Sequence, residues 1–216
     1  MASGTNGSGE LHDTPEALPV LRSTERFRGR LIAVRTDEVR MPDGASAARD
    51  VVVHPGAVGV IALDPDERVL LVQQYRHPVG RMLWEPPAGI LDVAGEPSLA
   101  TAQRELFEEA HYRAGRWDVL VDAFTSPGMA DEALRIYLAR DLSPAEGERH
   151  QGEHEEHDMP VAWLRLDEAV RKVLAGELHN PTAVMGILAA AAARRAGFAG
   201  LRPVDAPWPE RPGSPS

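Results

Sequence analysis

AGILDVAGE at residues 88–96, followed after seven residues by RELFEE at residues 104–109, is the stretch that decides the fold of this chain. Pro97, between the two segments, is typical of the first turn of a helix, where a missing N–H is no loss. Apolar residues then recur at helical spacing and form one face: Leu99, Ala102, Leu106 and Ala110. The pattern predicts an amphipathic helix that begins at Pro97.

Three carboxylates lie on one side of this predicted helix. Glu108 and Glu109 follow Glu105 by three and four residues, and side chains at these spacings are neighbours on a helix surface. A solvated acidic face is the ordinary interpretation, with Arg104 neutralising Glu108 from four residues away. The alternative is a divalent-cation site, because oxygen ligands without Cys or His suit Mg²⁺ or Mn²⁺.

Residues 89–112 resemble the Nudix box, G-x5-E-x7-R-E-U-x-E-E-x-G-U, in which U is a bulky apolar residue. Glu96 and the run from Arg104 to Glu109 match it residue by residue. Gly89 lies one position further upstream than the pattern requires, so the loop has one extra residue. His111 stands where the pattern has its last glycine and must end the helix, with a positive φ as one way to do so.

The resemblance implies a fold and a chemistry. The fold is α+β, a mixed β-sheet sandwiched between helices, which agrees with the interleaved strands and helices of the sequence. The chemistry is hydrolysis of a nucleoside diphosphate linked to another moiety, with Mg²⁺ or Mn²⁺ as cofactor. Such ions neutralise the diphosphate and lower the pKa of the attacking water. Glu96 is expected to close the loop or cap the helix rather than to bind metal.

The same resemblance assigns roles to the box residues. It implies that Glu105 and Glu109 are the chief metal ligands and that Glu108 assists them. The backbone carbonyl of Ala88 is a further expected ligand. Arg104 is expected to orient the glutamates without touching the metal.

Three features outside the box resemble the ADP-ribose pyrophosphatases, over residues 26–196. They are RDVVVHPGAV at 49–58, the pair QQYRHP at 73–78 and WEPPAG at 84–89, and Pro127, fifteen residues after Tyr112. Taken singly, each fits an ordinary turn, ion pair or core residue. Together they imply a substrate, ADP-ribose, and products, AMP and ribose 5-phosphate.

Substrate contacts follow from this resemblance and from side-chain chemistry. Arg76 is assigned to the diphosphate, because a guanidinium offers a planar fork of donors. Arg49 is a weaker candidate, and the loop Ser126-Pro127-Gly128 is expected to favour ADP-ribose over nucleoside triphosphates. An aromatic ring is expected to stack on the adenine, but the sequence does not single one out.

The resemblance to the ADP-ribose pyrophosphatases implies that the general base lies on an acidic loop before the last core strand, here the loop from Glu146 to Asp158 before a strand predicted at 159–164. Aligning back from that strand selects Glu155 as the catalytic glutamate, and a one-residue slip would select Glu156. A solvated loop without a catalytic carboxylate is the alternative. His154 and His157 are three residues apart, not four as in zinc proteases, so a histidine metal site is not expected.

Composition argues against other classes of protein. The chain has 216 residues, 23 basic and 33 acidic, with a formal net charge of −10, which argues against nucleic acid as a partner. It has no cysteine, so a disulfide framework, a thiolate metal site and a cysteine nucleophile are excluded. The N-terminus lacks the pattern of a signal peptide, and no apolar run is long enough to span a membrane, so a cytoplasmic location is expected.

The chain divides into four predicted parts. Residues 1–17 form a disordered arm, 18–56 an N-terminal β region, 57–198 the Nudix catalytic domain and 199–216 a Pro-rich tail without regular structure. The β region would leave an open edge in a monomer, and the resemblance implies that this region forms a homodimer. The remaining predicted strands are 28–34, 37–41, 50–53, 57–63, 68–74, 83–85, 117–124 and 133–139, with helices beginning at Asp167 and Pro181. A turn is predicted at Pro42-Asp43-Gly44, and the strands 57–63 and 68–74 are expected to form a hairpin around Asp64–Glu67.

Two further interpretations stay open. One is the same fold acting on another nucleoside diphosphate sugar. The other, of a different class, is an inactive Nudix domain that binds a nucleotide as a sensor. The intact Arg104, Glu105, Glu108 and Glu109 argue against the inactive form.

Overall fold

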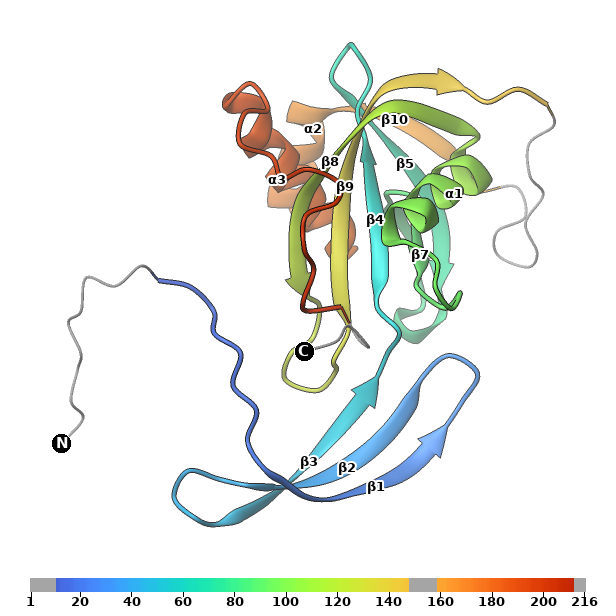
Figure 1. Ribbon diagram of the computed structural model, residues 1–216. Helices are drawn as coiled ribbons and strands as arrows, with labels where there is room; N and C mark the ends of the chain where they lie inside the picture. The colour runs from blue at the N-terminus through green and yellow to red at the C-terminus, as the bar shows by residue number, and fades with distance from the viewer. Residues whose placement is uncertain (1–10, 148–158, 212–216) are drawn as a thin grey trace.

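The structure, a computed structural model, describes residues 11–147 and 159–211. Ten strands and three helices lie within these ranges and form an α+β fold, as predicted. The body is a mixed β-structure with α1 on one side and α2 and α3 on the other (Figure 1). An N-terminal three-stranded sheet stands apart from this body and joins it where β3 runs into β4 (Figure 1).

The bounds of the elements are as follows. The strands are β1 Val20–Arg28, β2 Ala33–Arg40, β3 Ser46–Val53, β4 Ala57–Ala62, β5 Arg68–Arg76, β6 Arg81–Glu85, β7 Ala88–Ile90, β8 Tyr112–Phe124, β9 Ala133–Pro144 and β10 Val161–Arg165. The helices are α1 Ser98–Ala110, α2 Leu166–Leu174 and α3 Pro181–Arg195, with a short 3₁₀ helix at His77–Val79. No helix among the described residues is long and apolar enough to cross a membrane.

Two sheets make up the body. One has the strand order β7-β4-β9-β8 and the other β10-β5-β6. β4 and β9 run parallel, and the other strand pairs of these sheets are antiparallel, so the sheet structure is mixed as expected.

Alternation along the central strand β4 divides the core in two. Val58 and Val60 belong to the buried cluster that includes Leu106 of α1. Ile61 belongs to the opposite cluster, with Ile187 of α3. Because successive side chains of a strand point to opposite faces, one apolar strand binds both helical layers.

Glycine lets α3 approach this strand closely. A Cβ on Gly186 of α3 would lie 2.6 Å from Cδ1 of Ile61, and a Cβ on Gly59 would lie 2.3 Å from Cγ2 of Thr182. Real Cβ atoms do not make such short contacts, so the helix and the strand can pack at this distance only with glycine at both positions.

The strand predicted at 28–34 was wrong. β1 ends at Arg28, and the chain turns through residues 29–32, with the N–H of Gly29 donating to the carbonyl of Ile32. β1 is exposed along most of its length, so its sequence lacks the apolar alternation that marks a half-buried strand. The next turn is as predicted, with Gly44 at φ 86° closing the hairpin of β2 and β3.

The hairpin predicted around Asp64–Glu67 was half right. The turn is present, with hydrogen bonds between Asp64 and Arg68, and Leu63 bridges to Val69. Beyond that bridge the two strands part, since β4 joins one sheet and β5 the other. Turn residues therefore identified the reversal of the chain but not the pairing of the strands.

The described part of the C-terminal tail has no helix or regular strand, as its prolines predicted. It is not a loose extension, however. Trp208 is only 9% exposed and belongs to the core cluster on the α1 side.

Candidate active site

Helix α1 carries the carboxylates and ends in an unusual way. His111 caps its C-terminus with φ 60° and ψ 40°, a left-handed conformation usually taken by glycine. Its N–H donates to the carbonyls of Leu106 and Phe107, and its ring lies 5.6 Å from that of Phe107. The positive φ considered from the sequence is therefore present, and the box tolerates histidine here.

The guanidinium of Arg104 stands among three carboxylates. Nη1 donates to Oε1 of Glu105 at 2.7 Å and to Oε2 of Glu108 at 3.1 Å. Nη2 donates to Oε2 of Glu96 at 3.2 Å. Since the negative charges would otherwise repel one another, Arg104 makes their close approach possible.

Glu96 links the loop before α1 to the helix itself. Besides Arg104, its carboxylate accepts a hydrogen bond from the hydroxyl of Thr101 at 2.8 Å. Hydrogen bonds from Arg104 first, and from Thr101 second, hold the pKa of Glu96 below its usual value. The same bond to Glu96 raises the pKa of Arg104. The geometry agrees with the expectation that Glu96 closes the loop.

Glu109 points the other way, toward β7. It is 8% exposed, and its Oε2 accepts a hydrogen bond from the N–H of Ala88 at 3.0 Å. The next residue, Gly89, lies against Glu105, because a Cβ there would be 2.1 Å from Oε1 of Glu105. β7 and α1 thus bring Ala88, Glu105 and Glu109 together. Helical spacing predicted this for the two glutamates, and the Nudix resemblance implied it for Ala88.

The oxygen atoms of these glutamates and of Ala88 suit a hard divalent cation, but the side chains are not yet arranged as a complete coordination site. Carboxylates and a backbone carbonyl are the oxygen ligands that Mg²⁺ and Mn²⁺ prefer. Within residues 11–147 and 159–211, no three Asp, Glu, His or Cys side chains are arranged to hold a metal ion. Arg104 donates to one oxygen of Glu105 and one oxygen of Glu108, and because each carboxylate has two oxygens, a cation and the guanidinium can share them.

Arg76, predicted to contact phosphate, forms an ion pair. Its Nε lies 2.9 Å from Oε1 and its Nη2 2.6 Å from Oε2 of Glu85, whose side chain is 3% exposed. Glu85 was not singled out from the sequence, although a carboxylate inside a short apolar strand signals a buried partner. The pair places the guanidinium at the end of β5.

The other predicted substrate residues come from different elements. Arg49 lies on β3 and donates to the carbonyl of Ala48. The backbone carbonyl of Ser126 accepts hydrogen bonds from the N–H groups of Met129 and Ala130, so the loop 126–130 is a compact turn between β8 and β9. This loop lies beside β3, since the N–H of Val52 donates to the carbonyl of Met129 at 2.8 Å. Glu155, the predicted base, lies outside the described residues.

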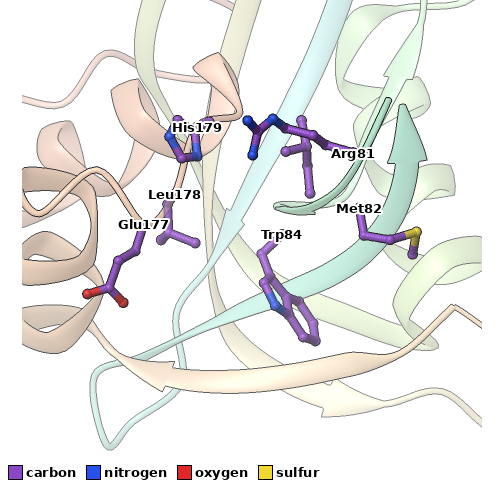
Figure 2. Close-up of a pocket in the computed structure, with 7 residues that line it drawn as sticks. Arg81, Met82, Trp84, Glu177, Leu178 and His179 are labelled. Atoms are coloured by element: carbon purple, nitrogen blue, oxygen red, sulfur yellow. The ribbon is translucent and has the colours of Figure 1, made fainter. Parts of the chain in front are cut away.

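A separate hollow of about 280 Å³ opens between β6 and the segment that precedes α3. Figure 2 shows Arg81 and His179 at one end of it and the Trp84 ring at the other. None of the predicted site residues lines this hollow. Trp84 is partly buried and packs against the core cluster on the α3 side.

Comparisons with known proteins agree with this geometry. The NUDIX domain model matches residues 53–184. The chain is 50% identical over 184 residues to the ADP-ribose pyrophosphatase of Mycobacterium tuberculosis (strain ATCC 25618 / H37Rv), covering 85% of this chain and 87% of that protein. It is 35% identical over 167 residues to the methanol dehydrogenase activator of Bacillus methanolicus, covering 77% and 89%. A crystal structure of an ADP compounds hydrolase, 19% identical, has the same fold, with a TM-score of 0.67 over 86% of this chain and 99% of that one.

We expect Gly89→Ala to weaken divalent-cation binding, because the added Cβ occupies the space of the Glu105 carboxylate. A displaced ligand should lower the affinity for Mn²⁺ at least about tenfold. Titration of the protein with Mn²⁺, followed by the paramagnetic signal of the free ion, measures this. Gly115→Ala is the control, since its Cβ would meet Asp141 at an ordinary 3.5 Å. Equal affinities of the two variants would contradict the placement of Glu105.

Proposed function

The chain belongs to the NUDIX family, and from this premise we propose that it hydrolyses the diphosphate bond of ADP-ribose, giving AMP and ribose 5-phosphate. The observation that carries the proposal is that Arg104 holds the box carboxylates Glu96, Glu105 and Glu108, while the fourth, Glu109, is held on the same helix by the N–H of Ala88. An inactive nucleotide sensor would not need this set. The substrate is supported by the relative of 50% identity, which bears the name ADP-ribose pyrophosphatase and aligns over most of both chains.

In this proposal Glu105 and Glu109 hold the divalent cation, with Glu108 and the carbonyl of Ala88 assisting. When bound, Mg²⁺ or Mn²⁺ supplies positive charge against the diphosphate and makes the attacking water more acidic. Arg104 keeps the carboxylates oriented. The N–H of Ala88 fixes Glu109 at one end of the set.

The substrate contacts stay with the residues expected from the sequence. Arg76 is proposed to bind the diphosphate, sharing its guanidinium between phosphate oxygens and Glu85. Arg49 and the loop Ser126-Pro127-Gly128 are proposed to complete the site. The contact of this loop with β3 supports that choice, because it brings the N-terminal sheet close to the body.

A homodimer is also proposed, through the N-terminal sheet. Large apolar side chains are exposed on and beside β1: Val20 at 55%, Leu21 at 46%, Phe27 at 56% and Leu31 at 44%. Grouped apolar side chains of this kind commonly mark an interface. A second copy of the chain is the occupant proposed here. A cytoplasmic location remains a prediction.

The test of the proposed function is a substrate panel assayed for nucleoside monophosphate release with Mg²⁺ or Mn²⁺. We expect the highest kcat/KM for ADP-ribose, above other nucleoside diphosphate sugars, dATP and 8-oxo-dGTP. Glu109→Gln should keep the fold and lose most activity, because a neutral amide is a poor cation ligand. Glu168→Gln on α2 is the matched control and should retain wild-type rates. Preference for a triphosphate would refute the substrate, and an active Glu109→Gln would refute the metal site.

Glu155→Gln should lower kcat by about 10²–10⁴-fold with little change in KM, the loss typical of a positioned general base. The box glutamates are poorer candidates for this role, because binding to a cation lowers their basicity. Steady-state kinetics of Glu155→Gln, Glu156→Gln and Glu153→Gln measure it. If Glu155→Gln keeps the wild-type kcat while Glu156→Gln or Glu153→Gln loses it, the general base is that other glutamate of the loop. Three silent variants would place the base elsewhere.

Phe27→Asp should shift the protein toward monomer and reduce its activity together, because a charge is buried in the proposed interface. Light scattering and activity over a dilution series from micromolar to nanomolar measure both. Leu174→Asp is the control, an apolar residue of α2 that is 74% exposed and lies far from β1 in sequence and fold. A monomeric wild-type protein with full activity at nanomolar concentration would contradict the dimer.

A further inference from the structure

The chain after α3 runs back along the sheet of the body (Figure 1). We call its described part, residues 201–211, the C-terminal strap. It begins at β8, where the N–H of Val119 donates to the carbonyl of Arg202 at 2.9 Å. The side chain of Arg202 then donates to Asp122 on the same strand.

A buried arginine of β9 anchors the middle of the strap. The side chain of Arg135 is 2% exposed and makes two 2.8 Å bonds to Asp122. Two further N–H groups of Arg135 reach the strap, at 2.9 Å to the carbonyl of Ala206 and 3.0 Å to that of Pro207. The Trp208 ring lies 4.7 Å from the guanidinium carbon. Since buried donors left without acceptors are costly, Arg135 and the strap stabilise each other.

The far end of the strap reaches the loop before α1. Trp208 belongs to the same buried cluster as Leu91, the residue that begins this loop, and Leu106 of α1. Arg211 then donates from Nη2 to the backbone carbonyl of Glu96 at 3.3 Å. Its own N–H bonds to the carbonyl of Trp208, which orients the last turn of the strap.

Glu96 is the point where this contact meets the candidate active site. The backbone carbonyl of Glu96 accepts a hydrogen bond from Arg211, while its carboxylate accepts hydrogen bonds from Arg104 and Thr101. Arg104 in turn holds Glu105 and Glu108. The loop itself includes Gly95 at φ 79° and a weak turn from Glu96 to Val93. A change in its backbone therefore moves the carboxylate that orients Arg104.

We propose that the C-terminal strap positions the loop 91–97, and that Arg211 is a positioning residue for Glu96 and, through Arg104, for the carboxylates of α1. The consequence for catalysis rests on the proposed function. The positioning of the loop by the strap does not rest on it, because this positioning concerns contacts within the chain. A tail that merely covers the core would need Trp208 but not Arg211.

Arg211→Ala tests the proposal in the full-length protein. Amide hydrogen exchange of the metal-free variant should be faster by about fivefold or more at residues 92–96, and unchanged in β4. The affinity for Mn²⁺ should fall about tenfold, as when other supporting partners of metal ligands are lost. kcat for ADP-ribose should fall while KM and the unfolding temperature stay close to wild type. Arg211→Lys, which can still donate to the carbonyl, should recover part of each effect.

Arg202→Ala is the matched control, because it removes an arginine from the other end of the same strap. It should leave amide exchange at residues 92–96 and the affinity for Mn²⁺ unchanged. Unchanged exchange in Arg211→Ala would overturn the proposal. So would equal effects of both variants together with a lower unfolding temperature, which would show a purely structural tail. Faster loop exchange in a protein that does not cleave ADP-ribose would uphold the strap and refute the proposed substrate.

Discussion

The candidate site depends on one guanidinium placed among like charges. Glu96, Glu105 and Glu108 all receive hydrogen bonds from Arg104, and Glu109 is held separately by the N–H of Ala88. A planar fork of donors can serve several carboxylates at once, whereas a lysine would offer a single point of charge. The acidic surface of α1 is therefore an ordered set of hydrogen-bonded carboxylates rather than a solvated face.

The elements around these carboxylates hold α1, β7 and the loop 91–97 in fixed positions relative to one another. β4 supports both helical layers through alternate side chains, and it pairs directly with β7, which carries Ala88 and Gly89. Gly89 admits Glu105 because it has no Cβ. The strap adds a contact to the loop from the opposite direction. The geometry of the site therefore depends on the packing of the core.

Several features of the fold and the site could be predicted from local sequence. The helix at residues 98–110, its buried face, the pairing of Arg104 with Glu108 and the turn at Gly44 all follow from spacings of a few residues, where local chemistry decides the outcome. The left-handed conformation of His111 could also be anticipated, because the box needs the helix to end there. β1 could not, since its exposed side chains carry no alternation.

Sequence alone determined the family, the α+β class and the identity of the carboxylates, because these depend on residue type and short-range spacing. The tertiary structure decided which sheet β4 and β5 each joined, since alternation defines the faces of a strand but not its neighbours. It also paired Arg76 with Glu85, nine residues away, and brought Arg211 to Glu96 across 115 residues. Contacts at such separations depend on how the whole core packs, and no local pattern in the sequence records them.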